Sequence, residues 1–196
     1  MRIFKWVVDT REFLGATGGG ARPKVKAVVC QLFGYPEKER DWVFREEGIG
    51  QSTVLTFATG GSAPSTPPIG SLREIAPPDG FIASGRQYCI RVGWVAEKSL
   101  PANGSKRGKV VRLPQRSSAE EEITAILCRG GARVEHMLRS SLRHEKDPKA
   151  GIGSLPVLDI EAVVTVEDAK AFGRLVESGV GRLRSYGFGM IIPRAE

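Results

Sequence analysis

The sequence predicts an α+β protein made of two tandem ferredoxin-like, RRM-like domains, which we place at residues 1–97 and 98–196. The chain has 196 residues, enough for one large domain or for two of about 90–100 residues. Hydrophobic residues make up 41% and charged residues 26%, so the chain can bury a core. The order of the local signals decides the fold class, because strand and helix signals follow one another as βαββ(α)β and a similar order then recurs.

The first half supplies a strand, a helix and three further segments. Alternation predicts a strand at Arg2–Val8, and the following T-R-E-F-L-G-A-T-G-G-G-A is predicted as a flexible loop. Pro23 starts a helix whose apolar stripe is flanked by Lys24 and Lys26 and which Gly34 ends. The remaining predicted elements are strands at 42–46 and 53–58, a short helical or irregular piece at 71–76, and a strand at 85–95 that completes the first sheet.

The second half repeats this order without detectable identity. An S-x-x-E capping box at Ser118–Glu121 starts a helix that Gly130 ends, and residues 165–168 cap a last helix that bears Phe172. The predicted strands are 109–113, 132–136, 157–164 and 188–192, and the polar basic stretch after His136 is predicted as a loop or short helix.

Positive charge is concentrated in the middle of the chain. There are 29 Lys+Arg against 22 Asp+Glu, a net charge of +7. Residues 86–116 alone hold eight basic residues and one acidic residue, so this segment carries an excess equal to that of the whole chain. Such a local excess indicates a polyanion-binding surface, although a merely solvated basic face remains the alternative.

The remaining composition excludes several classes. Cys30, Cys89 and Cys128 are isolated and are expected to be small buried hydrophobes in a reducing compartment. We expect no metal site, no cofactor and no membrane segment, hence a cytoplasmic protein. The two histidines, His136 and His144, are expected to be ordinary surface or packed residues, and the three tryptophans to belong to the core or a sheet face.

The stretch G-V-G-R-L-R-S-Y-G-F-G, residues 179–189, is the strongest local signal for a binding site. Its glycines allow backbone N–H groups to converge on an anion. Arg182 and Arg184 suit phosphate, and Tyr186 suits a base. The alternative is a tight turn between a helix and a strand, with two solvated arginines.

Three stretches resemble CasE, the CRISPR repeat-processing endoribonuclease of type I-E systems. The glycine-rich C-terminus matches the family's G-x-G…G-x-G loop, with Arg184 where the family has lysine. Q-L-F-G-Y-P-E-K-E-R-D-W-V-F-R-E-E-G and G-R-Q-Y-C-I-R-V-G-W resemble two further family segments, the second followed by a basic segment at 106–114. The resemblance implies two ferredoxin-like domains, binding of a CRISPR repeat RNA hairpin, and a metal-independent cut at its 3′ base by 2′-OH attack. It also implies that the enzyme stays on its product as a subunit of a CRISPR effector complex.

One departure concerns the chemistry. The position of the family's histidine is occupied by Lys26, and that of its tyrosine by Pro23. Lys26 could protonate the leaving 5′ oxygen if burial or neighbouring cations made its ammonium more acidic. Alternatively, arginines stabilise the pentacoordinate phosphate, as the resemblance to the histidine-lacking repeat-processing subunit of type IV complexes implies, with Arg22 and Arg40 as candidates.

The readings that remain are therefore a repeat-processing endoribonuclease, a non-cleaving crRNA-binding subunit of the same fold, and an unrelated ferredoxin-like regulatory protein. The candidate catalytic residues are Lys26, Arg22, Arg40 and Arg184. The candidate RNA contacts are Lys24, Arg86, Arg91, Lys106, Arg107, Lys109, Arg112, Gly179, Gly181, Arg182, Tyr186, Gly187 and Gly189.

Overall fold

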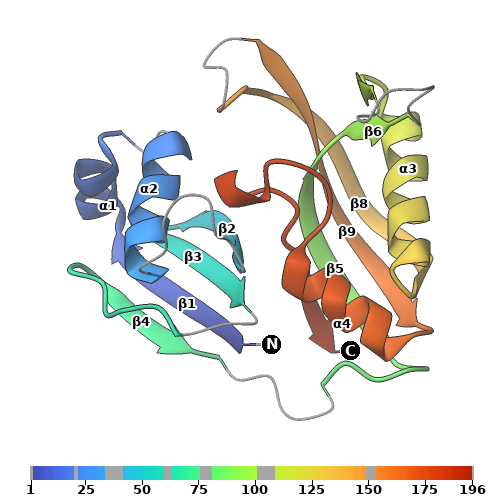
Figure 1. The fold of residues 1–196 in the computed structure, drawn as a ribbon, viewed down its shortest axis with the longest axis horizontal. Helices are drawn as coiled ribbons and strands as arrows, with labels where there is room; N and C mark the ends of the chain where they lie inside the picture. Colours follow the sequence, from blue (N-terminus) through green and yellow to red (C-terminus); the bar gives the residue numbers. More distant parts are fainter. Residues whose placement is uncertain are drawn as a thin grey trace.

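Two four-stranded antiparallel sheets, one from each half of the chain, form the molecule (Figure 1). The computed structural model describes residues 2–19, 22–33, 42–59, 63–75, 81–100, 109–148 and 153–195, with only the backbone of residues 22, 32 and 33. Both sheets have the strand order of a ferredoxin-like fold, so the predicted α+β class with two tandem ferredoxin-like domains is confirmed.

The first sheet has the order β4-β1-β3-β2. Its strands are β1 (Arg2–Asp9), β2 (Trp42–Ile49), β3 (Ser52–Thr59) and β4 (Ser71–Glu74). Helices α1 (Thr10–Thr17) and α2 (Arg22–Phe33) cover one face, where Trp6 and Phe13 meet edge to face at 5.8 Å between ring centroids. Val25 and Val29 bring α2 into the same cluster, because the apolar stripe repeats at helical spacing.

Two predictions for the first half are wrong. The segment after β1 is the helix α1 rather than a loop, because the Asp9 carboxylate accepts hydrogen bonds from the Arg11 and Glu12 N–H groups and Gly18 ends the helix in the left-handed conformation. In the piece predicted at 71–76, Ser71–Glu74 form the strand β4, which pairs with β1 through Trp6 and Leu72.

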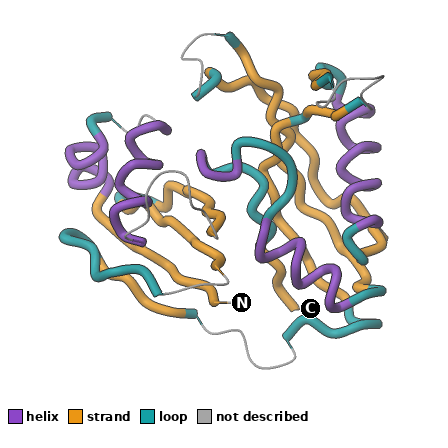
Figure 2. Tube along the Cα trace, in the orientation of Figure 1, coloured by secondary structure: helices purple, strands orange, loops and turns teal. Residues whose placement is uncertain are grey.

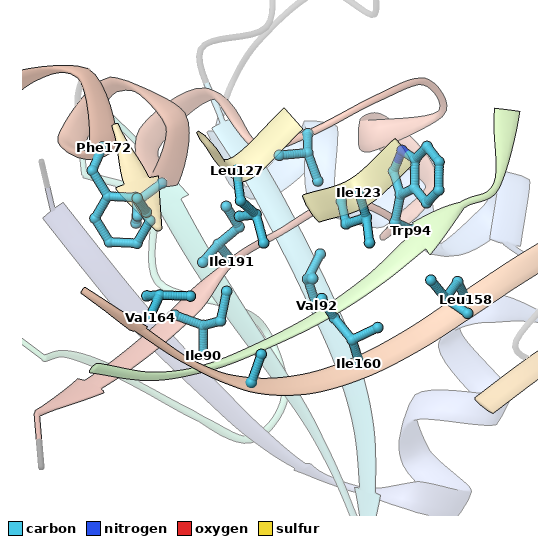
Figure 3. Close-up of a cluster of buried hydrophobic side chains, with 14 of the residues drawn as sticks. Ile90, Val92, Trp94, Ile123, Leu127, Leu158, Ile160, Val164, Phe172 and Ile191 are labelled. Atoms are coloured by element: carbon cyan, nitrogen blue, oxygen red, sulfur yellow. The ribbon is translucent and has the colours of Figure 1, made fainter. Parts of the chain in front are cut away.

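The second sheet has the order β10-β5-β9-β8. Its strands are β5 (Gln87–Val95), β8 (Ala132–Lys146), β9 (Ser154–Val166) and β10 (Ile192–Ala195). Helices α3 (Arg116–Arg129) and α4 (Ala169–Ser178) pack on one face, as the separate helices and strands of Figure 2 make visible. Figure 3 shows this core, in which Trp94 from β5, Ile123 from α3 and Phe172 from α4 are buried.

The strand at 85–95 was predicted as the last strand of the first domain, and this is wrong. It is β5, the first strand of the second sheet, where Gln87–Val95 pairs with β9 and Tyr88–Arg91 with β10. Its inward side chains, from Tyr88 to Trp94, are fully buried against α3 and α4. The two sheets therefore divide the chain between β4 and β5 rather than after residue 97.

Other boundaries in the second half also differ. The strand predicted at 109–113 is β7 (Val110–Arg112), which pairs with β6 (Glu97–Ser99) in a separate two-stranded ribbon. The basic stretch after His136 continues β8 without becoming a loop, since it pairs with β9 along its length through two bulges. The helix α3 begins at Arg116 without a side-chain cap, so Ser118–Glu121 is not its capping box. The last strand begins only at Ile192.

Single residues follow the expectations in part. The three tryptophans are buried, and so is Cys30, but Cys128 is exposed because it points away from the buried side of α3. None of the helices in the described residues is long and apolar enough to cross a membrane.

The two domains meet at a small apolar cluster. Val43 of β2 and Ala58 of β3 pack there with Met190 and Ile192 from the C-terminal end of the chain. The segment that joins α4 to β10 therefore lies at the junction of the domains and contacts β2 and α2. In Figure 1 this segment extends from α4 toward α2.

Candidate nucleic-acid interface

The glycine loop, residues 179–189, is a tightly closed turn at this junction. The Val180 N–H donates to the Gly189 carbonyl at 2.8 Å, and the Gly189 N–H donates to the Gly93 carbonyl of β5 at 2.7 Å. A Cβ at Gly189 would overlap the Val180 carbonyl oxygen, and one at Gly181 would overlap the indole of Trp94. Glycine is therefore required at both positions by packing within the protein.

The same loop presents a short 3-10 helix, η1 (Arg184–Tyr186). Leu183 begins it with a positive φ of 58°, which a non-glycine residue adopts only when its surroundings hold it there. The glycines at 179 and 187 also have positive φ. The N–H groups of Gly179, Gly187 and Gly189 already donate to carbonyls of the protein, so anion binding by the loop backbone stays a prediction.

The arginines of the loop are exposed but are held by the protein. Arg184 donates from Nη1 to the Ser178 carbonyl at 2.5 Å, so its guanidinium lies against the C-terminal end of α4. Arg182 donates from Nη1 to Oε2 of Glu97 at 2.9 Å. Both side chains therefore keep a fixed position while part of each guanidinium stays open to solvent.

Helix α2 brings Lys26 onto the loop. The Lys26 Nζ lies 5.2 Å from the centroid of the Tyr186 ring, within the range of a cation–π contact. Lys26 is 7% exposed, because it lies beside the packed stripe of α2 and faces the glycine loop that lies alongside the helix. Tyr186 from the glycine loop supplies the packing surface that covers it.

The other candidates on the first helix differ in their positions. Lys24 is exposed, and its Nζ lies beside Gly18 at the C-terminal end of α1, where a lysine is favourable. Arg22 is the first residue of α2, with its side chain outside the described residues, and Arg40 lies outside them altogether.

The described basic residues of 86–116 do not gather into one patch. Arg86 precedes β5 beside the end of β9, whereas Arg112 lies on the ribbon beyond the other end of β5. A strand rises about 3.3 Å per residue, so the length of β5 separates them by roughly 25–30 Å. Lys109 is exposed next to the ribbon, and Lys106 and Arg107 lie outside the described residues.

Acidic residues from other segments pair with several of these cations. Arg91 donates from Nη2 to Oε1 of Glu161 at 2.9 Å, and this hydrogen bond lowers the pKa of Glu161. Lys98 lies 2.8 Å from Glu122 of α3, which likewise lowers the pKa of that carboxyl. The local excess of positive charge seen in the sequence is therefore partly neutralised in space.

A groove that the sequence did not indicate lies where the domains meet. Its volume is about 570 Å³, and its charged lining residues are Arg45, Arg91, Arg139, Asp159 and Glu161. Arg91 and Glu161 alternate with buried residues, so they lie on the sheet face turned away from α3 and α4. Because Arg91 and Arg45 are paired with Glu161 and Glu47, the groove is not a bare anion site.

The described residues contain no cluster of His, Cys, Asp and Glu side chains fit to hold a metal ion. The two histidines lie exposed on β8, the edge strand of the second sheet.

Comparison with known proteins identifies the family. A family model described as CRISPR associated protein matches residues 23–193, which include α2, the ribbon and the glycine loop. The chain belongs to this family of CRISPR-associated proteins. The resemblance predicted from sequence is thereby confirmed at the level of the family, while no curated protein sequence matches.

Several solved structures have the same fold and align with this chain over nearly its whole length. CRISPR endoribonuclease Cse3 bound to a 19-nt RNA has a TM-score of 0.73 and 15% identity, over 99% of this chain and 100% of that one. Cas6e from Escherichia coli K-12 has a TM-score of 0.70 and 18% identity over 100% of both chains. A chain of a CRISPR RNA-guided surveillance complex has a TM-score of 0.69 and 17% identity, also over 100% of both. At such identities the likeness concerns the fold.

Proposed function

We propose that this protein is a CRISPR precursor-RNA processing endoribonuclease. It binds the repeat hairpin, cuts once at the 3′ base without a metal ion, and stays on the product as a subunit of a CRISPR effector complex. The observation that carries the proposal is the placement of Lys26 against the glycine loop at the domain junction, in a family of CRISPR-associated proteins. The shared fold with Cse3 bound to RNA and with a chain of a surveillance complex supports it.

The proposed reaction is an internal phosphoryl transfer. The ribose 2′ oxygen attacks the adjacent phosphorus as its proton passes to water, the bond from phosphorus to the 5′ oxygen breaks, and that oxygen takes up a proton. The products are a 2′,3′-cyclic phosphate and a 5′-OH. Negative charge grows on the phosphate oxygens and on the leaving oxygen, so fixed cations at these positions lower the barrier.

Lys26 is the residue that we assign to the leaving oxygen. Its ammonium donates the proton or stabilises the charge, and the contact with Tyr186 fixes its position. Arg184, Arg22 and Arg40 are assigned to the phosphate oxygens. Because one face of the Tyr186 ring is covered by Lys26, a base can stack only on the other.

The hairpin is held mainly by cations. Lys109 and Arg112, with Lys106 and Arg107, are assigned to stem phosphates next to the ribbon. Of the loop glycines, Gly181 is assigned to a phosphate at the cut, because the N–H groups of Gly179, Gly187 and Gly189 already donate to carbonyls of the protein. Lys24, Arg86 and Arg91 are assigned to outer contacts. Because side chains cannot enter the major groove of an A-form helix, such binding recognises the shape of the RNA rather than its sequence. It also weakens steeply as the salt concentration rises, because it depends on contacts between cations and phosphates.

The second candidate function is a crRNA-binding subunit that does not cut. The position that matches the family's histidine is Lys26, and the histidines on β8 do not replace it.

A cleavage assay separates the two. A labelled RNA hairpin with the host's CRISPR repeat sequence is incubated in EDTA with wild type, Lys26→Ala, Arg22→Ala, Arg184→Ala, and Lys170→Ala as an exposed control on α4. We expect a cut by wild type and by Lys170→Ala, and a loss of about 10²–10⁴-fold in the rate constant for Lys26→Ala. Tight binding by wild type without a cut leaves the second candidate. A product with a 3′-OH excludes 2′-OH attack.

A further inference from the structure

A nearly buried carboxylate joins two of the proposed RNA contacts. Glu97 is the first residue of β6, and its side chain is 8% exposed. Its Oε2 accepts the hydrogen bond from Nη1 of Arg182, and its Oε1 lies 3.9 Å from Nε of Arg112. The two arginines are 51% and 50% exposed. One carboxylate thus lies beneath two half-exposed guanidiniums, one from the glycine loop and one from the ribbon.

The ribbon itself is anchored to the second domain. Lys98 of β6 pairs with Glu122 of α3 at 2.8 Å, and the Leu113 N–H donates to the Ala96 carbonyl at 2.8 Å. Asp147, just after β8, lies 3.9 Å from Nη2 of Arg112. Glu97 therefore connects the glycine loop to a ribbon whose own position is already fixed.

The arrangement of charge in this cluster is favourable for RNA. The two guanidiniums are balanced by the carboxylates of Glu97 and Asp147, but the arginines are half-exposed whereas the two carboxylates are only 8% and 17% exposed. A long side chain that is held in place before binding loses less conformational entropy when it contacts a phosphate. A buried acid can thus strengthen the binding of a polyanion, although its own charge repels phosphate.

We propose that Glu97 is a positioning residue for the repeat RNA, which holds Arg112 of the ribbon and Arg182 of the glycine loop so that both engage neighbouring stretches of one hairpin. The proposal rests on the proposed function. It makes the contacts of the ribbon and those of the loop interdependent, so each arginine contributes less to binding when Glu97 is absent.

The test asks whether removing the negative charge of Glu97 weakens or strengthens the binding of the repeat hairpin. The dissociation constant of the repeat hairpin, with a 2′-deoxy nucleotide at the mapped cut to prevent cleavage, is measured for wild type, Glu97→Gln and Glu120→Gln. Glu120 is the control because it also pairs with an arginine, Arg116, which lies one turn away on α3 at 3.3 Å. Each of the two substitutions removes one negative charge. Simple electrostatics predicts tighter binding by both. We expect weaker binding by Glu97→Gln, about 5- to 20-fold, and unchanged or slightly tighter binding by Glu120→Gln.

Two further measurements separate positioning from damage to the fold. In an Arg182→Ala background, Glu97→Gln should lose the part of its effect that acts through Arg182. For Glu97→Gln alone, the single-turnover cleavage rate at saturating RNA should stay near that of wild type. If Glu97→Gln does not fold, Arg182→Lys, which keeps the charge but loses the planar fork, must weaken binding instead.

Binding by Glu97→Gln as tight as that of wild type, or an undiminished effect in the Arg182→Ala background, overturns the proposal. If wild type binds and cuts the hairpin while Glu97→Gln is neutral, this inference alone fails. If wild type does not bind the hairpin at all, the proposed function fails with it.

Discussion

The ammonium of Lys26 lies 5.2 Å from the centre of the Tyr186 ring, across the junction of the two domains. A cation–π contact of this kind is worth about 0.5–2 kcal/mol, which corresponds to roughly a 2- to 30-fold effect on a rate if the contact positions the reacting group. The contact is made by the face of the tyrosine ring, so we expect the ring rather than the hydroxyl to position the lysine.

The first prediction follows from this distinction. We expect Tyr186→Phe to keep the single-turnover rate of RNA cleavage within about twofold of wild type, and Tyr186→Leu to lower it about tenfold, because only the phenylalanine keeps a π face. The measurement uses saturating hairpin so that binding does not limit the rate. A tenfold loss in Tyr186→Phe would instead assign the role to the hydroxyl.

The second prediction concerns the packing of the glycine loop. Gly181→Ala should lower the free energy of unfolding by about 2–4 kcal/mol, because the new methyl group meets the buried indole of Trp94 at a positive φ. Gly173→Ala on α4 is the matched control, with nothing within 4 Å of the added methyl. It should stabilise the helix by about 0.5–1 kcal/mol. Urea unfolding followed by circular dichroism measures both, and equal effects would rule out the clash.

The third prediction concerns pH. The hydrogen bond from Lys98 holds the pKa of Glu122 below its ordinary value of 4.5. A carboxyl with a lowered folded-state pKa stabilises the fold above its unfolded pKa, and this contribution is lost as the pH falls through the folded value. Wild type should therefore lose about 1 kcal/mol more than Glu122→Gln between pH 6 and pH 3. Parallel curves for the two proteins would show that the pair does not contribute.

The fourth prediction uses the distance between the two ends of β5. Arg86→Ala and Arg112→Ala should each reduce the slope of log affinity against log salt by about 0.7–0.9 if each residue contacts a phosphate. Since roughly 25 Å separates them, the free-energy effects of the two substitutions should add within about 0.5 kcal/mol in the double variant. Strong non-additivity would mean that both residues act on the same part of the RNA.

Local patterns predicted the elements whose signals lie within a short stretch. Pro23 and the valine stripe marked α2, the alternation of apolar residues marked β1 and β5, and a short run of strand-forming residues marked β3. The eight-residue helix α1 was missed because it buries only Phe13 and Thr17, too few residues for a visible stripe. The continuous β8 was missed because its core-facing residues, such as Val134 and Leu142, are only partly buried and two bulges interrupt their alternation.

Relations between distant segments were not predictable in this way. Residues 85–95 can be recognised as a strand from the sequence alone. The sheet to which this strand belongs is decided by its pairing with β9 and β10, which follow much later in the chain. The burial of Lys26 depends on Tyr186, and the pairing of Arg182 depends on Glu97. The basic residues were predicted one by one, whereas the acids that neutralise them come from other elements.

The contact between Lys26 and Tyr186 also constrains when the protein becomes functional during synthesis. About 160 residues separate the two positions. At about 5–20 residues per second, a ribosome needs roughly 10–30 s after translating α2 before the residue that covers Lys26 exists. Until then the first domain can fold around Trp6 and Phe44, but it has no site. Under the proposed function, a nascent chain that already encounters repeat RNA therefore holds it only loosely and does not cut it.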